Sequence, residues 1–236
     1  MNRAKTYGAA AAALVLAALM VAAWVQAPAA GNGRPSAAVG ANPTAAVAQQ
    51  QVDPMIEART KGSDDAPIMI YEMSDFQCPV CLRFFNDYLP TIERDYIETG
   101  KVKFTFLNLP LIMLHSNAAE AHEYAMCAAA QDRFWDMHDR LFETQEAWSP
   151  MGDPTLHFIS LTEQLGLDQT ALRQCVESGA VRSLIAEEVR MASQNQLNGT
   201  PTFIIEGLAL QGLLPGELPA FLGILDSIYA ERIAGS

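Results

Sequence analysis

The feature that most limits the fold of this chain is a pair of cysteines, Cys78 and Cys81, at a junction between two kinds of apolar pattern. Residues 68–74 form an apolar run after Ala-Pro, which is typical of a buried strand. Residues 78–89 carry large apolar side chains at helical spacing and stop before a proline. Polar and apolar side chains alternate at the start of residues 102–109, which is typical of a second strand. A strand, a helix and a strand in this order predict a βαβ unit of a parallel sheet.

The second half of the chain is predicted to be helical before it returns to the sheet. Between residues 116 and 198, capping aspartates and terminating glycines separate about four or five amphipathic segments. Residues 202–205 and 208–210 then predict a β-hairpin, and apolar residues at helical spacing predict a C-terminal helix. The expected order is βαβ, helical insertion, β-hairpin and helix.

The N-terminus is typical of an export signal. Arg3 and Lys5 precede an uncharged stretch with a continuous apolar core over residues 9–25. The Ala-Pro-Ala that ends at Ala29 fits signal-peptide cleavage, although the same core could remain as a membrane anchor. Residues 30–64 are built mainly from small and polar side chains, which predicts a flexible linker because little apolar surface offsets the entropy of ordering. Both interpretations of the N-terminus place the rest of the chain outside the cytoplasm.

Charge and histidine placement exclude two classes of function. Fifteen Lys and Arg against 27 Asp and Glu give a formal net charge of −12, and no basic cluster could neutralise a nucleic-acid backbone. Zinc is also disfavoured, because Cys127 and Cys175 stand alone and no second Cys-x-x-Cys occurs. We therefore predict no nucleic-acid partner and no metal. Four histidines are interpreted as structural or surface groups: His115, His122, His138 and His157.

The active pair is predicted to perform disulfide exchange. Cys78 lies at a helix N-terminus, where unpaired N–H groups and the helix dipole favour a thiolate. The thiolate is the reactive species in exchange, and Cys81 is close enough along the helix to close a disulfide with it reversibly. We predict that Cys78 is the nucleophile and that Cys81 is the buried resolving thiol.

At these residues the sequence resembles the thioredoxin superfamily, and within it the DsbA-like thiol:disulfide oxidoreductases of the bacterial cell envelope. Three motifs carry the resemblance: Ser-Asp-Phe-Gln-Cys-Pro-Val-Cys at 74–81, Phe-Trp-Asp-Met-His-Asp-Arg-Leu-Phe at 134–142, and Gly-Thr-Pro-Thr-Phe at 199–203. The resemblance covers the chain from about Pro67 to the C-terminal helix. It implies an α/β fold class, a thioredoxin fold interrupted by an inserted α-helical domain. We place the thioredoxin-like domain at 65–115 and 197–236, and the insertion at 116–196.

The resemblance also assigns residues around the cysteines. It implies a cis peptide between Thr200 and Pro201 that faces the cysteine pair, where an ordinary trans proline is the alternative. Thr200 would then offer its backbone to an extended substrate peptide. Glu72 stands where DsbA-like proteins carry a buried acid that exchanges a proton with the second cysteine, unless strand alternation turns it to solvent.

Cys127 and Cys175 are candidates for a structural disulfide. Each follows an apolar residue by three positions on its predicted helix, so both are expected on apolar faces of the insertion, where they could meet. A pair that meets in an oxidising compartment closes. Two separately buried thiols are the alternative.

The resemblance implies an exported oxidoreductase that donates its disulfide to other proteins. Its partners would be reduced or misoxidised exported proteins and a membrane redox partner, a DsbB-type or vitamin K epoxide reductase-type quinone enzyme. It would act in the periplasm or at the outer face of the cytoplasmic membrane, with no cofactor besides its own disulfide. A reductase or isomerase on the same fold and a non-catalytic peptide-binding module are the alternatives. Because Val80 is neutral and apolar, we expect an oxidant weaker than DsbA.

Overall fold

A mixed five-stranded sheet forms the centre of the computed structural model, which describes residues 53–212 and 216–235. These residues belong to one compact unit, Gln50–Ser236. The strand order is β1-β3-β2-β4-β5. The strands are β1 (Thr60–Lys61), β2 (Ile68–Ser74), β3 (Val102–Asn108), β4 (Thr202–Ile205) and β5 (Leu208–Gln211). The central β2 and β3 are parallel and the other pairs are antiparallel, which confirms the predicted βαβ unit and hairpin.

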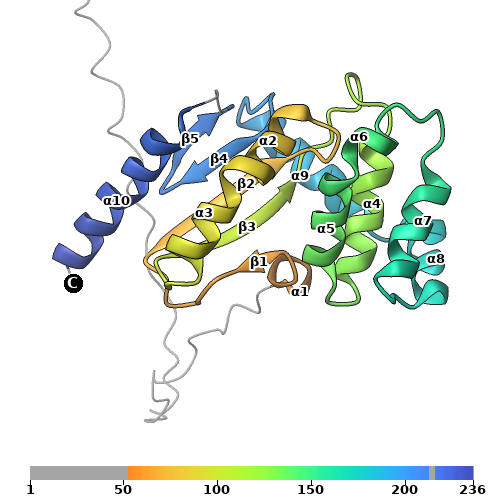
Figure 1. Cartoon of the computed structure of the whole chain (residues 1–236), viewed down its shortest axis with the longest axis horizontal. Helices are drawn as coiled ribbons and strands as arrows, with labels where there is room; N and C mark the ends of the chain where they lie inside the picture. The colour runs from red at the N-terminus through yellow and green to blue at the C-terminus, as the bar shows by residue number, and fades with distance from the viewer. Residues whose placement is uncertain (1–52, 213–215, 236) are drawn as a thin grey trace, which may run out of the picture. The chain divides into compact units, whose positions relative to one another are not determined.

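Helices α2 (Pro79–Asp87) and α10 (Leu218–Ala234) cover the same face of the sheet. Phe84 of α2 and Phe221 of α10 both pack on Phe203 of β4, with ring centroids 4.7 and 5.1 Å away. After α2 the chain continues through the short α3 (Leu89–Ile92) and a π-helical turn, Glu93–Ile97, across the front of the sheet in Figure 1. The helix predicted from residue 78 thus breaks next to its proline. The opposite face of the sheet packs on α9 (Arg182–Gln194) and on Ile56.

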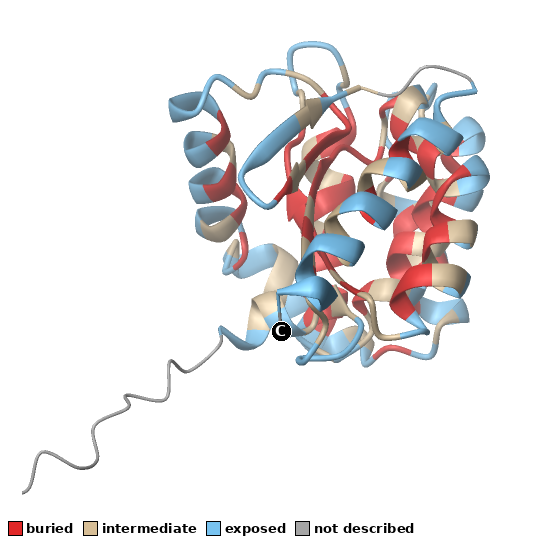
Figure 2. Ribbon diagram, turned by 90° about the vertical axis from the view of Figure 1, so that its left-hand side faces the viewer, coloured by how far each residue is buried: buried red, intermediate tan, exposed pale blue. Residues whose placement is uncertain are grey.

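The predicted insertion contains helices and no strand among its described residues. It has six helices, one or two more than predicted, because α6 is a single turn with no periodicity of its own. The helices are α4 (Ala118–Ala129), α5 (Phe134–Glu143), α6 (Gln145–Trp148), α7 (Thr155–Gln164), α8 (Gln169–Ser178) and α9 (Arg182–Gln194). As predicted, Asp168 caps the start of α8 and Gly179, at φ 65°, ends it. Figure 2 shows that the centre of the sheet and the inner helix faces are buried, whereas the edge strand β5 is mostly exposed.

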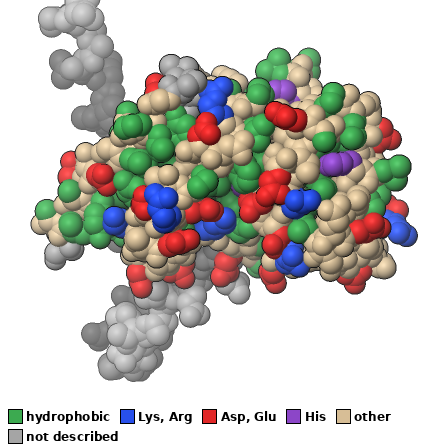
Figure 3. All heavy atoms as spheres, viewed as in Figure 1, with side chains coloured by type: hydrophobic (Ala, Val, Ile, Leu, Met, Phe, Trp, Pro, Cys, Tyr) green, Lys and Arg blue, Asp and Glu red, His purple; other side chains and the backbone are tan. Residues whose placement is uncertain are grey.

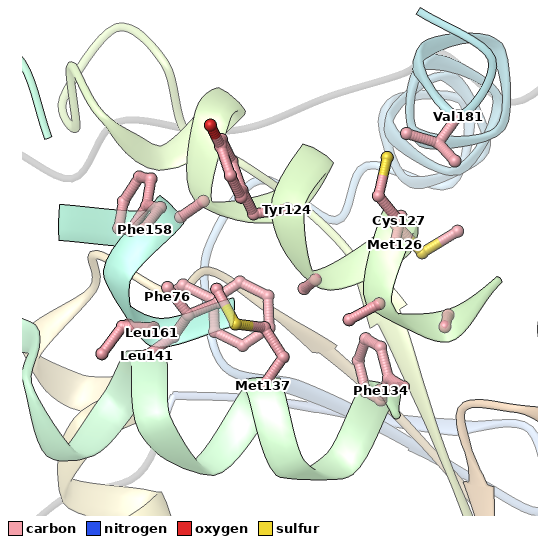
Figure 4. Packing of buried hydrophobic residues seen from close by; sticks show 14 of the residues in the cluster. Phe76, Tyr124, Met126, Cys127, Phe134, Met137, Leu141, Phe158, Leu161 and Val181 are labelled. Carbon is pink, nitrogen blue, oxygen red and sulfur yellow. The ribbon is translucent and has the colours of Figure 1, made fainter. Parts of the chain in front are cut away.

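Phe76 connects the end of the sheet that carries Cys78 and Cys81 to the core of the insertion. This residue follows β2, yet it is fully buried among insertion residues such as Met137 and Leu141, as Figure 4 shows. Its ring lies 5.0 Å from that of Phe106 on β3 and 5.1 Å from that of Phe142 on α5. Residues 75–78, which form the catalytic turn before α2, are therefore held by the core that the sheet and the insertion share.

The prediction of a flexible linker as far as residue 64 is wrong for residues 53–61. This segment forms α1 (Pro54–Glu57) and β1, which pairs with β3. Between them Arg59 is 1% exposed and makes a bidentate ion pair with Glu188 of α9, at 2.8 and 3.1 Å. A segment with few apolar residues is thus ordered by hydrogen bonds and a buried ion pair. The predictions for residues 1–29 and 30–52 lie outside the described residues.

None of the helices within residues 53–212 and 216–235 has the length and apolar content that crossing a bilayer requires. Acidic and basic side chains lie side by side over the face of the molecule in Figure 3.

Candidate active site

Cys78 and Cys81 lie at the start of α2, where the edge of the sheet meets the insertion. Cys78 is the N-cap residue in an extended conformation, and Pro79 begins the helix. The backbone N–H of Cys78 donates to the carbonyl oxygen of Asp75 at 3.0 Å. Both cysteines are free thiols in this structure, and Cys78 is 6% exposed whereas Cys81 is fully buried. The predicted order of accessibility is therefore present, although Cys78 itself is largely covered.

The two sulfurs differ in acidity. The pKa of Cys78 is lowered to about 6, chiefly by a hydrogen bond with the Cys81 thiol. Thr200 and the backbone at Val80 and Cys81 also stabilise the thiolate, against the opposing effect of burial. Burial raises the pKa of Cys81 well above its ordinary value, and the charges of Cys78 and Glu72 raise it further. At neutral pH the pair is a thiolate beside a thiol.

Thr200 and Pro201 face the nucleophile, as the resemblance implies. The peptide bond between them is cis, and the Sγ atom of Cys78 lies 3.6 Å from the carbonyl oxygen of Thr200. Pro201 is buried directly before β4. Residues that are far apart in sequence thus meet at one sulfur.

Glu72 is buried, so the alternative of a solvent-facing side chain is excluded. It is 1% exposed on β2, and its Oε2 atom has no hydrogen-bond partner among the described residues. Burial raises the pKa of Glu72 to about 8, with a smaller contribution from the charge of Cys78 and an opposing one from Ser74. At pH 7 the Glu72 carboxyl group is therefore mostly protonated. The charge of Cys78 raises the pKa of Glu72 and the charge of Glu72 raises the pKa of Cys81, so the carboxyl group interacts with both cysteines.

Asp75, the second residue of the motif at 74–81, also belongs to the site. Its carboxylate is fully buried. Oδ1 accepts the N–H of Gln77 at 2.8 Å, while Oδ2 accepts the N–H of Leu111 at 2.8 Å and contacts Nδ1 of His115 at 2.7 Å. The interpretation of His115 as a structural or surface group therefore leaves out its contact with the catalytic turn. An Asp that accepts the N–H two residues later is a local turn signal, but its partners after β3 are not visible in the sequence.

Gln145 holds the other side of the turn. Its Nε2 atom donates to the carbonyl oxygens of Phe76 and Cys78, at 2.7 and 3.1 Å. This glutamine belongs to α6, the single-turn helix that sequence periodicity did not predict. The catalytic turn is therefore held by side-chain hydrogen bonds on both sides.

Cys127 of α4 and Cys175 of α8 form the predicted disulfide across 48 residues of sequence, with Cα atoms 5.8 Å apart. This disulfide joins two helices of the insertion. Among the residues that the structure describes, no group of three or more His, Cys, Asp or Glu could hold a metal ion.

Comparisons with known proteins identify relatives of two kinds. A family model described as Thioredoxin matches residues 55–218. Disulfide bond formation protein D of Bacillus subtilis is 37% identical over 95 residues, which are 39% of this chain and 43% of that protein. The Na(+)/H(+) antiporter NhaA 3 of Salinispora tropica is 29% identical over 170 residues, 72% of this chain but only 24% of the antiporter. The chain therefore spans less than half of the length of either relative.

Among solved structures, the crystal structure of alpha-DsbA1 from Wolbachia pipientis matches with a TM-score of 0.67 and 23% identity. The match covers 75% of this chain and 93% of that chain. At this level of identity the match shows a shared fold, with a thioredoxin-like sheet and a helical insertion.

Proposed function

This chain belongs to the thioredoxin family, in the DsbA-like form that carries a helical insertion, and from that premise we propose that it oxidises the thiols of other proteins. The observation that carries the proposal is the difference between the two sulfurs, with a Cys78 pKa of about 6 and a Cys81 pKa well above its ordinary value. A sulfur of low pKa leaves a mixed disulfide readily, and it stabilises the reduced form of the pair.

The exchange proceeds in two steps. A client thiolate attacks Sγ of Cys78 in the oxidised protein, which forms a mixed disulfide and breaks the bond to Cys81. The Cys81 thiolate takes up a proton, for which the Glu72 carboxyl, protonated at neutral pH, is the buried source. A second client thiolate then attacks the client sulfur of the mixed disulfide and releases Cys78 as a thiolate. The client loses two electrons to become a disulfide, and the Cys78–Cys81 pair gains them as the dithiol seen in this structure.

Thr200 supports the choice of a protein as substrate. Its carbonyl oxygen lies beside the nucleophilic sulfur, so the backbone of an extended client can bind next to the bond that is exchanged. Recognition through backbone atoms places few demands on client side chains. We propose reduced or misoxidised exported proteins as clients, in the periplasm or at the outer face of the cytoplasmic membrane.

The proposed cycle closes with reoxidation of the dithiol by a membrane quinone enzyme of the DsbB or vitamin K epoxide reductase type. No cofactor besides the redox-active disulfide is required by the exchange chemistry. A reductase or isomerase uses the same site in the opposite direction, so the redox state in cells distinguishes the two directions.

The test uses the oxidised full-length protein and a reduced, unfolded client. Client disulfides are expected to form while the Cys78–Cys81 disulfide disappears in equal amount. Cys78→Ser should abolish exchange, whereas reduced Cys81→Ser mixed with a client that already carries a disulfide should accumulate mixed disulfides, because Cys78 attacks that disulfide and no Cys81 thiol remains to release the client. Thiol trapping in cells should find Cys78 oxidised. A protein that is fully reduced in cells would instead be a reductase or isomerase, and one inert toward dithiols would be a binding module.

A further inference from the structure

Asp75 and His115 form an ion pair at the base of the catalytic turn. The Nδ1 atom of His115 lies 2.7 Å from Oδ2 of Asp75, and the side chain of His115 is 18% exposed whereas that of Asp75 is fully buried. The backbone carbonyl of the same aspartate accepts the N–H of Cys78. One residue therefore contacts both the nucleophile and the histidine.

The charges of Asp75 and of protonated His115 have opposite effects on the Cys78 thiolate. The side chains of Asp75 and Cys78 are both buried in the same turn, and a carboxylate in such surroundings disfavours a thiolate because like charges in a poorly solvated site repel. A protonated His115 neutralises that carboxylate. The hydrogen bond with Asp75 raises the pKa of His115 against the effect of burial, and the charges of Asp75 and Cys78 raise it further. The histidine therefore keeps its proton to a higher pH than an ordinary imidazole does, whereas the pKa of Cys78 is lowered to about 6.

Among the residues that the structure describes, the other ionisable groups whose pKa is shifted by the charge of Cys78 provide no positive charge. They are Glu72 and Cys81, whose pKa values the thiolate raises. Within the Cys-Pro-Val-Cys motif, Val80 is also uncharged. The cation that the motif lacks is instead supplied by the segment that follows β3.

We propose that His115, protonated and held by Asp75, is a positioning residue that stabilises the Cys78 thiolate and so makes the disulfide more oxidising. The effect on oxidising power rests on the proposed function, whereas the test of this inference does not depend on that function. Its test is the ionisation of Cys78 in the reduced protein, which is measured without a client.

The experiment compares variants that separate charge from hydrogen bonding. His115→Asn keeps an N–H donor for Asp75 and removes the charge, and His115→Lys keeps the charge. His157→Asn is the matched control, because His157 lies on α7 and contacts Thr144 rather than the catalytic turn. Thiolate absorbance of the reduced full-length proteins is measured against pH.

We expect His115→Asn to raise the midpoint of Cys78 ionisation by about half a unit to one unit, the size of a partly screened charge interaction. At pH 5.5 the thiolate fraction should then fall about threefold to eightfold for a starting pKa of about 6. His115→Lys should retain the midpoint of the unmodified protein, and so should His157→Asn. Equilibration of His115→Asn with glutathione at pH 7 should show an oxidant weaker by about threefold to fivefold.

An unchanged midpoint in His115→Asn overturns the inference, since that variant removes only the charge. A raised midpoint in both His115→Asn and His115→Lys also overturns it, because a structural disturbance would then be the cause. The urea unfolding midpoint of each variant shows that the comparison is made between folded proteins. If the thiolate results are as expected but the unmodified protein does not oxidise clients, the proposed function fails and the role of His115 stands.

Discussion

Cys78 and Cys81 are one helical turn apart and differ in acidity, because hydrogen-bond donors stabilise a thiolate at Cys78 and burial disfavours one at Cys81. Cys78 stands before the first turn of α2, where backbone N–H groups have no partner within the helix, and it receives a hydrogen bond from Cys81. Cys81 is fully buried one turn later, where a charge is costly. The same helix therefore provides both a good leaving group and a thiol that stays protonated until the bond between them changes.

Glu72 links stability to pH. Its folded pKa of about 8 lies above the ordinary value of 4.5, so its contribution to stability is complete below about pH 4.5 and is lost as the pH rises through 8. Glu72→Gln cannot titrate. Its unfolding free energy relative to the unmodified protein should therefore increase by about 3 kcal/mol between pH 4 and pH 7.

This difference is measured by urea unfolding of the oxidised proteins, in which neither active cysteine titrates. The exposed Glu98 provides the control, and Glu98→Gln should show no such trend. A Glu72→Gln difference that stays constant with pH would show that the carboxyl group is ionised in the folded protein.

Sequence reasoning missed the roles of certain residues for one physical reason, which is that these roles depend on contacts between residues far apart in the chain. Cys78 and Cys81 stand in a local motif, so their chemistry can be predicted from neighbours in the chain, whereas the place of Pro201 beside them was implied only by the resemblance. Asp75 and His115 are 40 residues apart, and each acquires its role only through the other. Periodicity reports which face of an element is apolar and carries no information about which polar side chains meet.

Among the helices and strands, elements with an apolar pattern were predicted well and those ordered by polar contacts were not. β2 begins and ends at the predicted residues, because a run of apolar side chains bounded by a turn has few alternatives. α1 and β1 were missed because Arg59 orders them through Glu188, which is 129 residues away. The single-turn α6 was missed because a single turn has no measurable period.

The ion pair of Arg59 with Glu188 yields a prediction about how these elements are held. Arg59→Met removes one partner and leaves the Glu188 carboxylate buried, which should cost about 3–5 kcal/mol of unfolding free energy. Adding Glu188→Gln removes the second charge and keeps an oxygen acceptor for Asn108, whose N–H and Nδ2 both bind Glu188 at 2.7 Å.

The double variant should therefore lose less stability than Arg59→Met alone when both are unfolded in urea. If the second substitution only added to the loss, the buried carboxylate would not be the cause of the cost.

The disulfide between α4 and α8 should stabilise the insertion through the unfolded chain. Because Cys127 and Cys175 are separated by 48 positions in sequence, replacing both by Ser should lower the unfolding free energy by about 4 kcal/mol in the chain-entropy account. Urea unfolding with the active pair oxidised in both proteins measures this loss. Mass spectrometry of the unreduced protein should find no alkylatable thiols besides the active pair, and finding two more would refute the bridge.

For the whole molecule, the charge distribution and the site together set the oxidising power. The Cys78 pKa of about 6 lies between the values of about 7 for thioredoxin and about 3.5 for DsbA. The net charge of −12 disfavours a thiolate, although charges beyond about 8–10 Å are screened at ordinary ionic strength. The reduction potential should therefore lie between about −270 mV for thioredoxin and −120 mV for DsbA.

Equilibration with a glutathione buffer measures this potential. Val80→His places inside the motif a side chain that can carry a positive charge and donate a hydrogen bond. This substitution should shift the reduction potential to a more positive value. A potential as negative as that of thioredoxin would favour the reductase direction instead.

The distance in sequence between Cys78 and Thr200, 122 residues, has a consequence for how the protein is made. A ribosome completes the two reactive cysteines first and the strand that follows Pro201 long afterwards. Throughout that interval the nascent chain carries a dithiol whose pocket does not yet exist. Cys127 emerges in the same interval, before its native partner Cys175 has been synthesised. An early bond between Cys78 and Cys81 is a native one, so the correct pairing of Cys127 requires that it stays reduced until Cys175 is present or that a wrong bond is rearranged by exchange.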